Sequence, residues 1–192
     1  IDLNHIAMAG HSFGGYTTFA LAGAQYPSEI LEAVCQRQGG TLCDSFNGPV
    51  GERLRSGLTD HRIGVALPQS AGNFTLFDYG VSSVSIPTLM ITATRDQANT
   101  EETSNEPDWT HLKDASNVHR RVSFLEAGHA TFTVACEHFP TLEQDDGCGD
   151  SFTPVLDAQS VMLSYALIFA RAHLWQDQES LKVLEALDAA LP

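Results

Sequence analysis

A serine flanked by glycines near the start of the chain constrains the fold more strongly than any other feature. Residues 10–14 spell Gly-His-Ser-Phe-Gly and match the pattern G-x-S-x-G, with Ser12 at its centre. The short apolar segment 6–9 before the motif predicts a buried strand of a parallel sheet. The segment 16–24 after it is rich in alanine, leucine and threonine and predicts a helix. The motif therefore stands in the strand–turn–helix context that it requires.

This context suits a serine that acts as a nucleophile. A serine in so tight a turn requires a strained backbone conformation. The small residues Gly10 and Gly14 allow the backbone on either side of the serine to come close together. The following helix directs its positive N-terminal end toward Ser12, where negative charge develops during acyl transfer. The backbone N–H of Phe13 is the expected first donor of an oxyanion hole, and the sequence does not identify the second. The alternative is that the Gly-Ser-Gly cluster is only a loop.

Further apolar segments alternate with helical patterns along the chain. We expect strands and helices over the following ranges: strands 62–68, 88–93 and 121–125, and helices 154–174 and 179–191. The glycine-bearing stretch 36–57 is expected to have little regular structure, and 97–115 to form a polar helix or loop. Strands that alternate with helices predict an α/β fold, with a mostly parallel sheet flanked by helices. The 192 residues contain no linker or repeat and are expected to form a single domain.

An acid and a histidine follow the ends of later predicted strands. Asp96 comes directly after the strand 88–93, and His129 follows the strand 121–125 at a Gly-His step. Ligands of such sheets bind at the carboxyl ends of the strands, so we expect Ser12, Asp96 and His129 to meet there. A serine hydroxyl needs an imidazole to take its proton, and the imidazole needs a carboxylate to orient it. The three residues therefore predict a catalytic triad.

Other acids and histidines compete for these two roles. The competing acids are Glu126, Asp78 and Asp108, and the competing histidines are His5, His11, His61, His111, His119, His138 and His173. Asp96 is favoured over the other acids because it immediately follows a strand between Ser12 and His129. Its alternative role is a surface aspartate that pairs with Arg95 or caps the next helix.

A few side chains near the predicted site are candidates for contacts with a substrate. His11 lies inside the motif, and the loop after the strand 62–68 carries Phe74 and Phe77. Phe13 and Phe132 could line the same apolar pocket. Aromatic side chains belong to the hydrophobic core more often than to a binding surface, and this is the competing interpretation.

The four cysteines form two local pairs. Pairing Cys35 with Cys43 and Cys136 with Cys148 is the simplest of three connectivities. Disulfides would place the mature protein in an oxidising compartment, secreted or periplasmic. The alternative is a metal site built from four side chains: Cys136, His138, Cys148 and Asp150. That spacing fits no standard zinc pattern, so we expect disulfides and no metal, and free buried thiols are the remaining alternative.

Charge and hydropathy exclude several classes of partner. The net charge of −14 leaves no basic stripe for nucleic-acid phosphates and disfavours anionic membrane surfaces. No apolar run approaches the roughly 20 residues that span a membrane. The longest, 161–172, is interrupted by Ser164 and Arg171 and predicts a core helix. The chain begins with Ile1 and shows no signal peptide, so we expect a processed, trimmed or excerpted product.

These residues together resemble the carboxyl-terminal two-thirds of an α/β-hydrolase. Within that superfamily the chain is similar to predicted dienelactone hydrolases and to esterases like platelet-activating-factor acetylhydrolase. The resemblance rests on 6–17, 86–96, the Gly128-His129 step and the loop 136–148. It implies hydrolysis of carboxylic esters of small to medium acyl chains, without metal or organic cofactor. Ser12 would be the nucleophile, His129 the general base and then acid, and Asp96 the orienting acid, in the order that this scaffold requires.

The chain departs from that family before the strand 6–9. The strands that precede it in an α/β-hydrolase have no counterpart, so it would be an exposed apolar edge and an aggregation hazard. A separate or cleaved amino-terminal segment, a second copy in a homodimer, or the chain's own helices could cover this edge. Two other functions also remain open. One is a peptidase or amidase with the same triad, and the other is a hydrolase-derived binding domain without catalysis.

Overall fold

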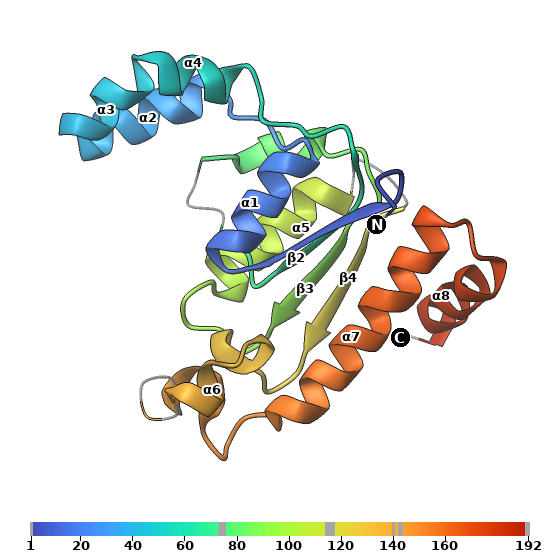
Figure 1. Ribbon diagram of the computed structural model, residues 1–192. Helices are drawn as coiled ribbons and strands as arrows, with labels where there is room; N and C mark the ends of the chain where they lie inside the picture. The colour runs from blue at the N-terminus through green and yellow to red at the C-terminus, as the bar shows by residue number, and fades with distance from the viewer. Residues whose placement is uncertain (1, 73–75, 114–117, 140, 142–143, 191–192) are drawn as a thin grey trace.

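Four parallel strands, arranged in chain order, form the centre of the molecule (Figure 1). The computed structural model describes residues 2–72, 76–113, 118–139, 141 and 144–190. Its strands are β1 (Ile6–His11), β2 (Ile63–Gln69), β3 (Leu89–Ala93) and β4 (Arg120–Phe124). All four were expected, and each boundary agrees with the sequence pattern to within two residues.

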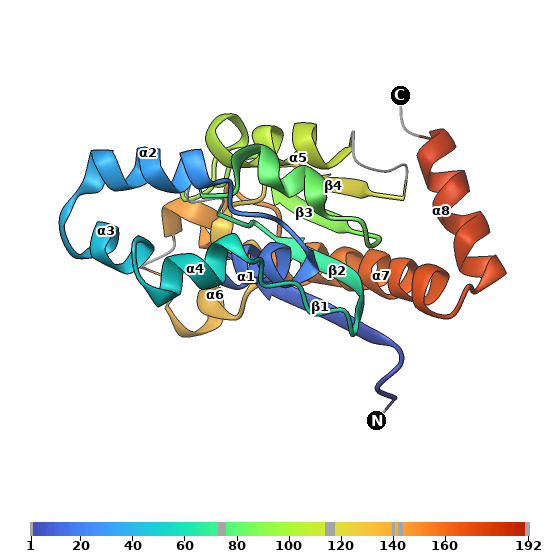
Figure 2. The same ribbon diagram turned by 90° about the horizontal axis from the view of Figure 1, so that it is seen from above.

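Helices flank both faces of this sheet, as the views in Figures 1 and 2 show. One face carries α1 (Phe13–Ala22) and α5 (Glu106–Lys113), and the other carries α7 (Val155–Leu174), which α8 (Gln178–Ala190) follows. The predicted α/β architecture with a parallel sheet flanked by helices is therefore confirmed. Residue Leu191, the expected end of the last helix, lies outside the described residues.

Side-chain alternation along the central strands divides the hydrophobic core in two. Ala66 of β2 and Met90 of β3 point to the α1 and α5 side, where Phe19 is buried. Their strand neighbours point to the opposite side and pack against α7: Val65, Leu67, Leu89, Ile91 and Ala93. A strand with apolar side chains on both faces is what a parallel sheet covered on both sides requires. The alternation thus fixes which helix covers which face.

The stretch 36–57 is helical, so the prediction of little regular structure there is wrong. It holds the end of α2 (Ser28–Gln38), then α3 (Gly40–Phe46) and α4 (Pro49–Arg55). These helices form an arm that projects from the body in Figures 1 and 2. Gly39, with φ 62°, separates α2 from α3, and α3 and α4 have seven residues each. Helices of two turns are too short to show a clear hydrophobic period, and their glycines mimic a loop.

β1 is an edge strand, as the sequence predicts. Its Ala7 and Ala9 lie opposite Val65 and Leu67 of β2, so they face the side of the sheet on which α7 packs. Both alanines are exposed. Although α7 contacts β1, the helices of the described residues leave these two alanines exposed. That an amino-terminal segment or a second copy covers it stays a prediction.

The helix α7 is the one described helix that is long and apolar enough to cross a membrane by length and composition. That test alone is weak evidence, because the core helix of a soluble fold can pass it too. Here α7 packs against β2 and β3 through Ala158, Met162, Phe169 and Ala172. The packing agrees with the predicted core helix along one stripe only, since Leu156, Leu163 and Leu167 of the same helix are exposed.

Candidate active site

Ser12 sits in a strained turn between β1 and α1. Its φ of 55° and ψ of −116° lie in a region that L-residues rarely occupy, at a cost of about 1–3 kcal/mol. The backbone N–H of Ser12 donates to the carbonyl of Gln69 at 2.9 Å, and its own carbonyl accepts from the N–H of Tyr16 at 3.1 Å. The expected strand–turn–helix context is confirmed. These two hydrogen bonds attach the turn to β2 on one side and to α1 on the other.

The glycines of the motif have different roles in this turn. A Cβ atom built on Gly10 would lie 2.2 Å from the carbonyl oxygen of Gly14, which no real contact permits. A Cβ on Gly15 would lie 2.8 Å from the Cβ of Ala71. A Cβ on Gly14 meets nothing within 4 Å. Gly10 thus lets β1 lie against the backbone of Gly14, and Gly15 lets α1 lie against Ala71. No such contact requires a glycine at position 14.

This difference predicts opposite effects of two alanine substitutions. We expect Gly10→Ala to destabilise the fold by about 3 kcal/mol, which lowers Tm by about 6–12 °C. Gly14→Ala should stabilise the fold by about 0.5–1 kcal/mol, because it replaces a glycine near the start of α1. Thermal unfolding followed by circular dichroism measures both. Equal Tm values for the two variants would contradict the described turn.

Asp96 and His129 form a direct pair at the carboxyl edge of the sheet. His129 Nδ1 lies 2.9 Å from Asp96 Oδ2, and the aspartate side chain is fully buried. The other carboxylate oxygen, Oδ1, accepts from the backbone N–H of Asn99 at 2.7 Å. Because an ionised carboxylate only accepts, Nδ1 of His129 carries the proton and donates. This tautomer leaves Nε2 as the acceptor that a general base needs.

His11, the neighbour of Ser12, contacts the same histidine. Its Nε2 donates to the backbone carbonyl of His129 at 2.8 Å, and the two ring centroids lie 4.5 Å apart. Burial, followed by the proximity of His129, lowers the pKa of His11, which keeps its ring neutral. The structure therefore places the predicted nucleophile next to a residue that touches His129. Its Nε2 is thus occupied by the carbonyl of His129, and the expected contact of His11 with substrate stays a prediction.

Buried amides support the loop that carries Asp96. The side chain of Asn99 donates to the carbonyl of Ser70, and Asn105 donates to the carbonyl of Asn99. Asn105 belongs to η2 (Glu101–Asn105) and is fully buried. These bonds anchor the acid to the end of β2 and to the turn before α5.

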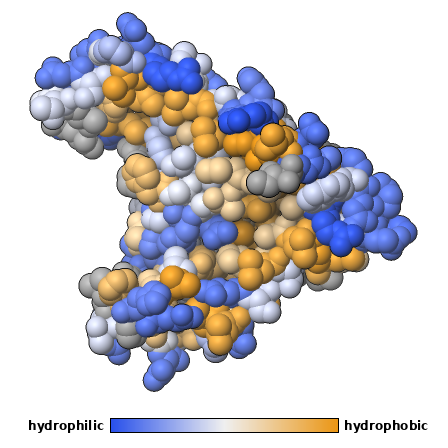
Figure 3. Space-filling view, in the orientation of Figure 1, coloured by the Kyte–Doolittle hydropathy of each residue, from blue (hydrophilic) through white to orange (hydrophobic). Residues whose placement is uncertain are grey.

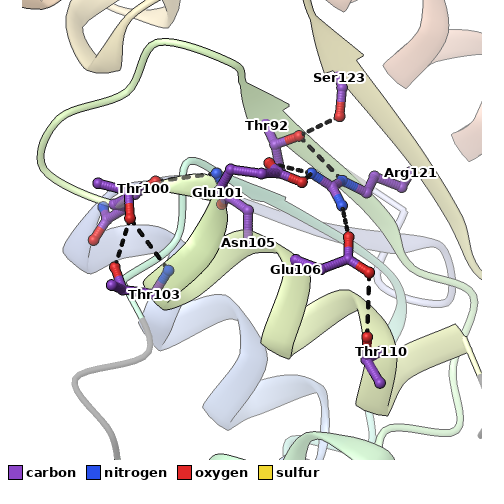
Figure 4. Close-up of polar contacts among 10 residues, drawn as sticks. Thr92, Thr100, Glu101, Thr103, Asn105, Glu106, Thr110, Arg121 and Ser123 are labelled. Carbon is purple, nitrogen blue, oxygen red and sulfur yellow. Dashed lines mark hydrogen bonds and ion pairs between the residues drawn. The ribbon is translucent and has the colours of Figure 1, made fainter.

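An arginine on the neighbouring strand holds the same turn to the sheet (Figure 4). Arg121 of β4 forms ion pairs with Glu101 and Glu106 and donates to the hydroxyl of Thr92. Its side chain is only 11% exposed, so these pairs are partly shielded from water. Together with the amides, this network fixes the segment that leads away from Asp96.

The competing acids have other partners or positions. Glu126 is exposed and pairs with Arg95 at 3.1 Å, and exposed Asp78 lies 3.6 Å from His111. Asp108 is buried within α5. Of these four acids, Asp96 is the one that pairs with His129.

Of the aromatic residues that the sequence predicts to contact substrate, some are exposed and others are buried in the core. Phe77 is fully buried and stacks on Tyr16 with ring centroids 4.5 Å apart, so it belongs to the core and the prediction of a contact surface there is wrong. Phe132 is also buried, against Phe124. Phe13 is 65% exposed beside Ser12, and Phe74 lies outside the described residues. Figure 3 shows the surface hollowed between the α2–α4 arm and the region of α6 (Ala135–His138), the side at which β1 ends.

Both expected disulfides are present. Cys35 pairs with Cys43 and joins α2 to α3, and Cys136 pairs with Cys148. Among the described residues there is no cluster of three or more side chains that could hold a metal ion. The alternative zinc site is therefore excluded for its two cysteines, which are bonded to each other.

A cavity of about 420 Å³ lies between β4, α7 and α8. It is lined by apolar side chains together with Arg120, Arg121 and Asp157, and it includes neither Ser12 nor His129. An apolar cavity of this kind is a common place for a small ligand. The paired His129 and Asp96 and the strained turn at Ser12 lie outside this cavity.

Asp146 belongs to the site and was not expected there. Its carboxylate oxygen Oδ1 accepts from the backbone N–H of His129 at 2.8 Å and from that of Gln97 at 3.1 Å. It lies in η4 (Gln144–Cys148), inside the loop of the second disulfide. The only signal in the sequence is an Asp-Asp-Gly turn before a cysteine, which indicates a turn and no particular partner.

Comparison with protein-family models gives no match to the chain, and no curated protein matches it. Any conclusion about activity therefore rests on the residues and their geometry.

Proposed function

We propose that the chain is a serine esterase of the α/β-hydrolase type that cleaves carboxylic esters through an acyl-enzyme intermediate. The observation that carries the proposal is the pairing of His129 with buried Asp96, together with the contact between His129 and His11, the residue before Ser12. Ser12 stands in a strained turn at the end of β1. A serine, a histidine and a carboxylate are the parts of a nucleophilic triad, and in this proposal Nε2 of His129 accepts from the hydroxyl of Ser12. The strain at Ser12 supports this role, because such conformations cluster at active sites.

Each residue has one role in the proposed reaction. Nε2 of His129 takes the proton of the Ser12 hydroxyl as Oγ attacks the ester carbonyl carbon. The N–H of Phe13, at the start of α1, donates to the oxyanion that forms. The alcohol leaves with the proton from Nε2, and an acyl-Ser12 ester remains. Water, deprotonated by the same nitrogen, then releases the carboxylic acid and restores Ser12.

Apolar side chains near the site support an ester with a hydrophobic acyl or alcohol group, and we propose small to medium acyl chains. Three large apolar side chains are exposed on elements near the site: Phe13 next to Ser12, and Val134 and Phe139 on either side of α6, which contacts the segment 129–132. We propose that they contact the acyl or alcohol group of the substrate. The mechanism requires no metal or organic cofactor. The two disulfides are compatible with an oxidising compartment, and we propose a secreted or periplasmic protein.

Hydrolysis of p-nitrophenyl acetate tests this function, with the matching p-nitroanilide as the amide comparison. We expect a burst of p-nitrophenol as acyl-Ser12 accumulates, then steady turnover, and much slower cleavage of the anilide. Faster anilide cleavage would replace the esterase by a peptidase or amidase. No turnover of either compound by protein with a folded circular dichroism spectrum would favour the non-catalytic binding domain.

A further inference from the structure

Three separate contacts hold His129 in place. Its side chain pairs with Asp96, its backbone carbonyl accepts from Nε2 of His11, and its backbone N–H donates to Oδ1 of Asp146. Both backbone polar groups of this one residue are thus bound by side chains from distant parts of the chain. Such binding fixes the peptide planes on both sides of the histidine, and with them the direction of its ring.

Asp146 also holds the loop that carries the acid. The same oxygen that binds the N–H of His129 accepts from the N–H of Gln97, the residue directly after Asp96. In addition, the side-chain amide of Gln97 donates to the backbone carbonyl of Asp145. One carboxylate oxygen therefore joins the two loops whose side chains form the Asp96–His129 pair.

Two glycines, Gly128 and Gly147, let the loop of Asp146 lie directly against the loop of His129. A Cβ on Gly128 would lie 2.5 Å from the carbonyl carbon of Asp146, and a Cβ on Gly147 would lie 2.8 Å from the N atom of Thr131. Gly147 also has φ 124°, a conformation that favours glycine. The two backbones are in direct contact, so a displacement of one loop displaces the other.

The second disulfide keeps Asp146 in this contact. Cys148 lies two residues after Asp146, and its bond to Cys136 closes a loop with a sequence separation of 12. At its other end the loop begins in α6, which contacts η3 (His129–Phe132). The disulfide therefore ties the residues just after Asp146 to α6, the helix that contacts the segment beginning at His129.

We propose that Asp146 is a positioning residue for the reaction, and that the Cys136–Cys148 disulfide maintains its position. This proposal rests on the proposed esterase function. Without the carboxylate, two N–H groups lose their acceptor, and the loops of Asp96 and His129 lose their common support. A shift of about 1 Å in a catalytic group can lower the rate by about 10²-fold.

The first test compares three variants of the same turn. We expect Asp146→Leu to lower kcat by about 10²-fold at nearly constant KM, because the substrate surface is unchanged. Asp146→Asn keeps an acceptor oxygen and should restore most of kcat. Asp145→Leu removes a negative charge from a neighbouring exposed residue and should leave kcat unchanged. Equal kcat for wild type and Asp146→Leu would overturn the proposal, as would equal losses in Asp146→Leu and Asp145→Leu.

A measurement without catalysis separates this proposal from the proposed function. The ring Nδ1–H proton of His129, bonded to Asp96, should give a downfield proton NMR signal that is absent in His129→Gln. We expect the signal in wild type, Asp146→Asn and Asp145→Leu, and its loss or broadening in Asp146→Leu. A wild type that shows the signal but no ester turnover would refute the esterase and leave the positioning intact. An unchanged signal in folded Asp146→Leu would refute the positioning.

The disulfide is tested by paired double substitutions. Cys136→Ser with Cys148→Ser should lower kcat and weaken the His129 ring signal, because the loop of Asp146 is released. Cys35→Ser with Cys43→Ser opens the crosslink in the α2–α4 arm and should change neither readout, even if Tm falls. The same kcat loss in both double variants would show a general loss of stability and would contradict a positioning role for the Cys136–Cys148 bond.

Discussion

Replacing Ser12 by alanine is expected to lower kcat for p-nitrophenyl acetate by up to about 10⁶-fold, while the fold is retained. The substitution removes the atom that attacks the ester, and residues 10–15 carry no other hydroxyl. Relief of the strained backbone is not expected, because alanine must adopt the same φ of 55°. Stopped-flow and steady-state assays measure both the burst and the turnover.

The matched control for this substitution is Ser160→Ala, which changes an exposed serine on α7. We expect wild-type rates from it. Retention of the burst in Ser12→Ala would show that another residue is acylated, and the assignment of the nucleophile would then be wrong.

Asp96→Asn is expected to lower kcat by about 10⁴-fold. An asparagine amide can donate to Nδ1 of His129, and this would leave the imidazole proton on Nε2. The ring could then no longer accept the proton of Ser12. Steady-state kinetics over a range of pH, with the fold checked by circular dichroism, measures the loss.

Glu126→Gln is the matched control for the acid. Glu126 precedes His129 by three residues, and its carboxylate pairs with Arg95 at the surface. We expect this variant to keep its kcat, since a surface ion pair contributes little to the site. A larger loss in Glu126→Gln than in Asp96→Asn would reverse the assignment of the acid.

The parts of the site that the sequence predicts correctly are those with a local signature. The turn at Ser12 follows from glycines between an apolar strand and a helix. Asp96 and His129 follow from their places directly after predicted strands, because all parallel strands end at one edge of the sheet. Their direct contact of 2.9 Å confirms that argument for the acid and the histidine. The cysteine pairing also follows from spacing alone.

The remaining parts depend on contacts between distant segments. Asp146 binds backbone N–H groups that lie 17 and 49 residues away, and any polar residue in a turn would look the same in sequence. His11 contacts a carbonyl 118 residues away. Phe77 looks like a loop aromatic, yet the rings of Tyr16 and Tyr26 bury it. In each case the residue's contact partner belongs to another element of the fold. The composition and hydrophobic periodicity of the residue's own segment therefore do not predict that contact.

Labelling with a fluorophosphonate, followed by peptide mass mapping, tests the central claim most directly. Oγ of an activated serine displaces fluoride from phosphorus and remains covalently bonded to it. We predict one label per chain, on Ser12, with labelling absent in Ser12→Ala and strongly slowed in His129→Gln. A folded wild-type protein that takes up no label, or that carries the label on a residue other than Ser12, would contradict the account.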